Sequence, residues 1–181
     1  MKKCTGLSII FFCFIITARS QDFGYKTIDA GAEFQWYPAG YISALHLAYN
    51  FPIHHAIQVR IGYNKANRGD RGKHDDEEGG GPGFSLGYRY YFLVRPHGFF
   101  LGARSDIWHL NIDWKQGTST GTSKIWVVQP TFEIGYMFLI NDEFFISPSI
   151  ANGAEINIKT QGQPVGESFI TLAGISAGWK F

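Results

Sequence analysis

The sequence is short of cysteine. Its two cysteines, Cys4 and Cys13, both lie within the first twenty of 181 residues. Without that segment the chain can form no disulfide and has neither a thiol nucleophile nor a cysteine-based metal site. Long apolar runs are lacking too, since the stretch at 7–16 is shorter than the roughly 20 residues that a membrane-spanning helix needs.

The first twenty residues have the pattern of a secretory signal peptide. Lysines at 2–3 precede the apolar stretch at 7–16, and small residues flank Arg19 at 18–20. This order predicts cleavage before Gln21, leaving one domain over residues 21–181. A lipoprotein acylated at Cys13 is the alternative, although phenylalanines and not small residues precede that cysteine.

Neither sign of charge is in large excess. Beyond residue 20 the chain has 13 Lys and Arg against 15 Asp and Glu, a net charge of −2. Nucleic-acid binding needs a concentrated basic surface, so we exclude a nucleic-acid partner. We also predict no cofactor and no metal. Glycine and aromatic residues, by contrast, are abundant, with 22 glycines and 17% aromatics.

Apolar residues recur at every second position, the period of a β-strand. Eight strands are predicted, at about 27–37, 41–51, 57–63, 84–92, 99–114, 126–138, 144–155 and 169–181. Short turns are expected near Pro52, Pro96 and Asn141, and loops at 64–82, 115–123 and 159–167. The apolar parity flips in the fifth strand at Trp108, which indicates either a β-bulge or a strand that leaves the membrane there. The sequence therefore predicts an all-β fold, an eight-stranded antiparallel up-and-down barrel.

Alternation alone does not separate a membrane barrel from a soluble one. On the polar face of seven strands, however, a glycine lies two residues from a charge, as in Gly87 and Arg89 or Gly102 and Arg104. A narrow lumen explains this pairing, because a large side chain then needs space beside it. Two aromatic girdles support a transmembrane barrel. They are predicted at Tyr37, Tyr63, Trp126 and Phe169, and at Tyr49, Phe51, Tyr90, Phe92, Tyr136 and Trp179.

These strands, together with the ending Gly178-Trp179-Lys180-Phe181, resemble the small eight-stranded outer-membrane barrels similar to the OmpA transmembrane domain and OmpX. The resemblance covers residues 21–181 and implies an integral protein of the outer membrane with both termini in the periplasm. It also implies that Trp179 and Phe181 are part of a signal read by the barrel-assembly machinery. The surrounding partners would be outer-membrane lipid and lipopolysaccharide, and the barrel a monomer. The resemblance says little about activity.

Charged residues on the inward face are the candidate site. They are Asp29, Glu33, Arg60, Arg89, Arg104, Asp106, Glu133, Glu155 and Lys180. Buried charges persist when they are paired, so we predict a lumen charge network that plugs the barrel. A small gated or passive pore, in which the pairs exchange partners, is the alternative.

Two lipid A-modifying enzymes are barrels of similar size, and the chain matches neither well. The His-x-Ser motif of the deacylases is missing. Pro130 and Pro148, on neighbouring strands and facing lipid, resemble the prolines of the palmitoyltransferases, which implies a lateral seam. The catalytic histidine of that family has no counterpart, so we predict a non-catalytic protein.

The predicted loop at 64–82 offers two short motifs. Arg68-Gly69-Asp70 is a tripeptide that some adhesins use to bind integrins, and the acidic run at 74–78 has oxygen ligands that a divalent cation accepts. Both motifs are also common in loops that bind nothing, so neither identifies a ligand. We predict only that this loop is a surface for an extracellular ligand.

Overall fold

The computed structural model describes residues 26–181, so the predicted signal peptide lies outside the described residues. The strands are β1 (Ile28–Tyr37), β2 (Gly40–Asn50), β3 (His55–Asn67), β4 (Asp76–Tyr91), β5 (Gly98–Gln116), β6 (Ser119–Ile140), β7 (Phe144–Ala154), β8 (Ile156–Gln161) and β9 (Phe169–Lys180). A 3-10 helix, η1 (Gly69–Arg71), separates β3 from β4. In the described part of the chain, no helix is long and apolar enough to cross a membrane.

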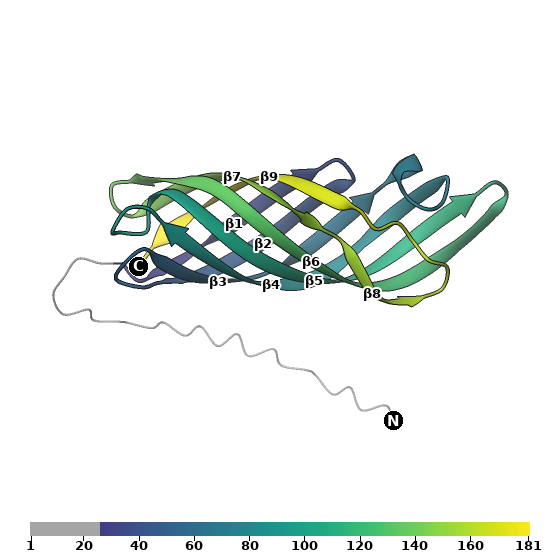
Figure 1. The fold of residues 1–181 in the computed structure, drawn as a ribbon, viewed down its shortest axis with the longest axis horizontal. Coiled ribbons are helices and arrows are strands. Elements are labelled where there is room, and N and C mark those ends of the chain that lie inside the picture. The colour runs from purple at the N-terminus through teal and green to yellow at the C-terminus, as the bar shows by residue number, and fades with distance from the viewer. Residues whose placement is uncertain (1–25) are drawn as a thin grey trace, which may run out of the picture.

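The strands close into a barrel. Each strand pairs antiparallel with its neighbours, and β1 pairs with β9 to complete the ring (Figure 1). Both β7 and β8 pair with β6, β7 along Thr131–Ile140 and β8 along Lys124–Val128, so together they form one wall strand. The result is the predicted closed eight-stranded antiparallel barrel, whose closure joins the two edges that an open sheet would expose.

The two ends of the barrel differ. The turns at 51–54, 92–97 and 141–143 share the terminal end with both ends of the described chain, where Lys26 forms a 3.1 Å salt bridge with Glu143. At the opposite end, here called the loop end, the β5–β6 hairpin projects furthest (Figure 1).

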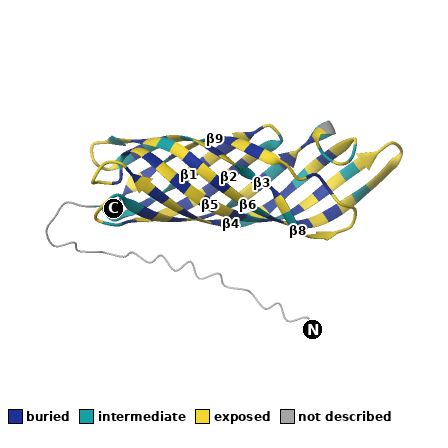
Figure 2. Cartoon of the chain, in the orientation of Figure 1, coloured by how far each residue is buried: buried dark blue, intermediate teal, exposed yellow. Residues whose placement is uncertain are grey.

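Buried and exposed residues alternate along most strands, whereas β8 is exposed over most of its length (Figure 2). The outward face is apolar: Leu45, Ile61 and Phe132 are 62%, 65% and 77% exposed. An apolar belt around the whole wall exceeds what a soluble monomer usually exposes. It is the surface that lipid hydrocarbon contacts in transmembrane barrels.

The interior has three layers. At the loop end an apolar cluster includes Trp108, Leu110 and Ile125. At the terminal end a smaller cluster contains Phe100 and Phe145. The layer between them is made of buried charged and polar side chains.

The loop predicted at 64–82 is wrong over most of its length. Strand β3 continues to Asn67 and β4 begins at Asp76, so Gly79–Gly81 lie within β4. A Cβ atom at Gly81 would collide with the His109 carbonyl oxygen. Here glycine permits close approach of two strands, whereas the sequence interpretation took it as a loop signal.

Other loops and faces also differ from the predictions. The loop at 115–123 is a two-residue turn between β5 and β6, and β8 occupies part of 159–167. Of the two explanations given for the parity flip at Trp108, the β-bulge is wrong, because β4–β5 pairing keeps one register and Trp108 faces inward like Arg104. The apolar residues of β5 change from outward to inward positions at Trp108 because the interior becomes apolar toward the loop end. Tyr37, predicted in a lipid-facing girdle, is buried and donates a 2.7 Å hydrogen bond to Asn64.

Candidate functional site

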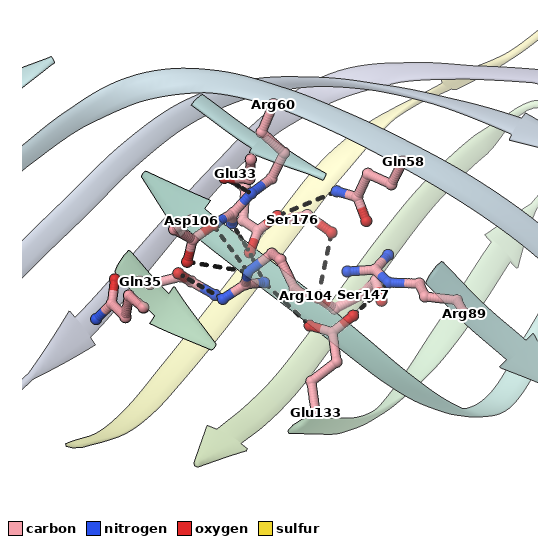
Figure 3. A network of polar contacts seen from close by, with 12 residues as sticks. Glu33, Gln35, Gln58, Arg60, Arg89, Arg104, Asp106, Glu133, Ser147 and Ser176 are labelled. Carbon is pink, nitrogen blue, oxygen red and sulfur yellow. Dashed lines mark hydrogen bonds and ion pairs between the residues drawn. The ribbon is translucent and has the colours of Figure 1, made fainter. Parts of the chain in front are cut away.

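Six of the nine predicted lumen charges meet in one network (Figure 3). Arg60 on β3 lies at its centre, with Nη1 donating to Glu33 Oε1 and Nη2 to Asp106 Oδ1, each at 2.7 Å. Its Nε also donates to Ser85 Oγ at 3.2 Å. The side chains of Arg60, Glu33 and Asp106 are 1%, 2% and 0% exposed.

Two further arginines complete this network. Arg104 Nη1 donates to Glu133 Oε2 at 3.3 Å and its Nε to Asp106 Oδ2 at 3.2 Å. Arg89 donates to the other Glu133 oxygen and stacks over the Phe100 ring at 4.5 Å. The network therefore holds three guanidinium groups against three carboxylates. This balance is what burial of charge requires.

The remaining three predicted charges lie elsewhere. Lys180 and Asp29 form a separate pair at the terminal end, 2.7 Å apart, and Asn50 donates to the same carboxylate. Glu155 lies toward the loop end, where its Oε2 is 3.4 Å from Arg68 Nη2. The prediction of one network is thus corrected to three groups, because strand tilt spreads the inward positions along the barrel.

The group at the loop end is centred on Glu77, a buried residue that was predicted in an exposed acidic run and not in the lumen. Arg68 forms salt bridges with two carboxylates, from Nη1 to Glu77 Oε2 at 3.2 Å and from Nη2 to Glu155 Oε2 at 3.4 Å. Glu77 also accepts from the backbone amides of Lys73 and Gly166, at 2.8 and 3.0 Å. It therefore ties the segment after β3 to the segment before β9. Its parity would have identified it as inward if 64–82 had been predicted as strand.

The electrostatics of Glu77 follow from these bonds. Burial is the largest influence on the Glu77 carboxyl and raises its pKa. Four groups lower this pKa, in decreasing order of effect: the Gly166 amide, His74, the Lys73 amide and Arg68. The net effect holds the pKa of Glu77 below its ordinary value of 4.5.

The two motifs of the 64–82 segment do not form free ligand sites. Arg68 is buried in its ion pairs, so the Arg-Gly-Asp arginine is not exposed for an integrin. Glu77 of the acidic run points inward. Among the described residues, no group of three or more His, Cys, Asp or Glu side chains is arranged to hold a metal ion.

Glycines make room in the lumen, though not always for the predicted charge. A Cβ atom at Gly102 would lie 2.7 Å from Glu133 Cγ, so this glycine makes room for a network carboxylate and not for Arg104, the charge predicted beside it. At Gly135, by contrast, the space is filled by the Phe100 ring. The pairing of glycine with charge in sequence is therefore partly coincidental.

Pro130 and Pro148 both face outward on the seam between β6 and β7–β8. The ladder pairs Val128 with Ile156 and next Thr131 with Gly153, so it is interrupted at Pro130. It is interrupted again opposite Pro148. Proline has no N–H to donate, which accounts for both breaks. At the end of the chain, Trp179 and Phe181 face outward and are 56% and 67% exposed.

The sequence matches no family model and none of the curated proteins. Solved structures do match. The N-terminal β-barrel domain of Pseudomonas aeruginosa OprF aligns with a TM-score of 0.54 at 17% identity, covering 88% of this chain and 100% of that chain. Ail, the attachment invasion locus protein of Yersinia pestis, aligns with a TM-score of 0.52 at 11% identity, covering 86% and 97%.

A second Ail structure, in complex with the heparin analogue sucrose octasulfate, aligns with a TM-score of 0.50 at 11% identity and the same coverage. At such identities the likeness concerns the fold. The closed ring of strands, the apolar outer wall and these neighbours agree on one conclusion: the chain has the fold of the small eight-stranded outer-membrane β-barrels.

Proposed function

We propose that the protein is a non-catalytic, monomeric outer-membrane barrel with a plugged lumen, whose loop end presents a surface to the cell exterior. The observation that carries this proposal is the filled interior beneath an apolar wall. Both ends of the described chain, Lys26 and Phe181, then lie on the periplasmic side. Insertion would use the barrel-assembly machinery, which reads Trp179 and Phe181.

The plug has three consecutive obstacles to water. An ion entering from the loop end meets the cluster around Trp108 and Ile125, next the Arg60 network, and last the rings of Phe100 and Phe145. Opening a path requires separating buried ion pairs, which leaves charges uncompensated. The geometry therefore favours a closed barrel over the alternative, a small gated or passive pore.

Planar-bilayer recording tests the plug. Purified protein, shown to be folded by a mobility difference between boiled and unboiled gel samples, should give no channel events. Arg89→Ala, which removes one network cation, should also stay silent because both apolar layers remain. Regular conductance steps in the wild-type protein would overturn the plug and establish the pore.

Binding at the loop end is the second part of the proposal. In place of a long loop at 64–82, the structure offers the segment 68–75 and the rigid β5–β6 hairpin, which stand beyond the apolar belt. Deletion of residues 117–118 and replacement of 72–75 by a short linker should abolish adhesion to a surface that the wild type binds. Unchanged phenotypes in both variants would count against the binding role.

The proline seam supports a minor alternative, a lipid-modifying enzyme. Two ladder breaks on one strand pair, at Pro130 and Pro148, weaken the wall where a lipid chain could enter. If the protein is non-catalytic, the lipid A mass spectrum of overproducing cells stays unchanged. A new lipid A mass that disappears in Pro130→Ala/Pro148→Ala would establish the enzyme instead.

A further inference from the structure

Two lysines beside the seam have no ion partner. In the described part of the chain, the salt bridges use Lys26, Lys65 and Lys180 and leave four lysines without a carboxylate, of which Lys124 and Lys159 lie beside the seam. Both are exposed on the outer wall, Lys124 on β6 and Lys159 on β8. Unpaired cations on one patch attract an anion.

The polarity of the wall changes at the level of these lysines. Along β5 the outward side chains pass from Ile107 to His109, and along β6 from Val128 through Trp126 to Lys124. His109 stacks against Trp126 with ring centroids 4.8 Å apart. Aromatic side chains of this kind mark the membrane–water interface. The two lysines therefore lie where lipid headgroups meet the barrel.

A β-bulge is what brings Lys159 to this surface. Asn157 pairs with the inward residue Val127, and strict alternation would turn Lys159 inward as well. The register between β6 and β8 shifts after that pair, so Lys159 pairs with the outward residue Trp126. A bulge commonly re-aims a side chain in this way. Lys124 pairs with Gln161, which makes the two lysines diagonal neighbours at about 7–8 Å between Cα atoms.

An apolar hollow lies deeper in the belt, over β3–β6 and two rows of outward side chains beyond Trp126. Its volume is about 540 Å³, and its wall includes the outward residues Ala103, Ser105, Pro130 and Phe132. Ser105 pairs with Pro130, one row of outward side chains beyond Ile107 and Val128. The small size of Ala103 and Ser105 leaves space for the hollow, and the row of Ile107 and Val128 separates it from His109 and Trp126, a distance that an acyl chain can span.

We propose that Lys124, Lys159 and the His109–Trp126 pair, together with this hollow, form a binding site for a phosphorylated glycolipid of the outer leaflet. The phosphate lies between the two ammonium groups, and one acyl chain fills the hollow. A phosphate monoester carries about −1.5 to −2 charges at pH 7, which matches two lysines better than the single charge of a phospholipid diester. This inference rests on the proposed outer-membrane location.

A second hollow on the wall shows why charge matters. It is larger, about 850 Å³, and lies beside Tyr63 and Phe34, over β1–β4 and β9. The cation above it, Lys65, is already paired with Glu78 at 2.7 Å. That hollow can hold an acyl chain, but the lysine above it is held by a carboxylate and is not available to a phosphate. It is therefore the internal comparison for the proposed site.

Native mass spectrometry of the protein in neutral detergent tests the site with two probes, diphosphoryl lipid A and phosphatidylglycerol. The wild type should bind lipid A more tightly than phosphatidylglycerol. In Lys124→Gln/Lys159→Gln the lipid A affinity should fall about 10- to 30-fold, since the variant loses the electrostatic attraction of two interfacial lysines for the phosphate. Lys65→Gln/Lys115→Gln, with the same charge change, should bind as the wild type does.

The hollow is tested separately. Ser105→Phe should weaken lipid A binding by filling the space for the acyl chain, whereas Ala173→Phe, on the outward face of β9, should not. Equal binding of both probes to the wild type, or unchanged binding in the Lys124/Lys159 variant, would overturn the site. Heat-modifiability of every variant monitors the barrel itself, and failure of the wild type to insert into bilayers would refute the proposed location independently of binding in detergent.

Discussion

Arg60 provides the sharpest test of the plugged lumen. It contacts Glu33 and Asp106 at 2.7 Å each, and all three side chains are almost fully buried. Arg60→Met keeps much of the volume but leaves both carboxylates to Arg104, at 3.6 and 3.2 Å. Removing one partner of a buried ion pair costs about 3–5 kcal/mol. We expect the free energy of unfolding to fall by this amount.

The assay is urea-dependent unfolding in lipid vesicles, followed by the gel mobility shift and by tryptophan fluorescence. The double variant Arg60→Met/Asp106→Asn should lose less than the sum of the single variants, with a coupling energy of about 1–3 kcal/mol. Lys65→Met, which breaks the half-exposed pair with Glu78, is the control and should cost no more than about 1 kcal/mol. A similarly small loss for Arg60→Met would show that water reaches the network and would refute the plug.

Three further predictions concern the other layers of the interior. Gly102→Val places a side chain against the Glu133 carboxylate and should destabilise the barrel by about 1–3 kcal/mol in the same assay, whereas a neutral outcome would mean that the lumen has spare room. Trp108→Ala empties the loop-end core and should cost about 3–5 kcal/mol, and a value near zero would place this tryptophan in solvent. Because the pKa of Glu77 is below 4.5 in the folded protein, its stabilisation is present above that pH and lost as pH falls through the folded pKa. Above pH 4.5, the amides of segment 162–168 should thus be more protected from hydrogen exchange in the wild type than in Glu77→Gln, and in acid the two proteins should become equal. A difference that stays constant with pH would contradict the role of the Glu77 carboxylate.

Much of this architecture was predictable because the period of a strand is two. Once Phe84 and Leu86 are assigned to lipid, Ser85, Gly87 and Arg89 must face inward. The same parity identified every member of the Arg60 network. It failed at Glu77, where the strand itself was missed because the glycines at 79–81 looked like a loop. It also failed at Tyr37 and Trp108, which are apolar side chains that face inward. The sequence contains no local signal that distinguishes a glycine in a turn from one beneath a neighbouring strand.

By itself, then, the sequence determined the fold class, the inward or outward direction of most side chains, and the presence of balanced charge inside. Only the tertiary structure decided which charges meet. Arg60, Glu33 and Asp106 are brought together from β3, β1 and β5 by the tilt and register of the closed sheet. It also decided that Lys159 faces outward, through one bulge in the β6–β8 ladder. Register and bulges are properties of strand pairs and arise from the whole barrel, so no single strand's pattern contains them.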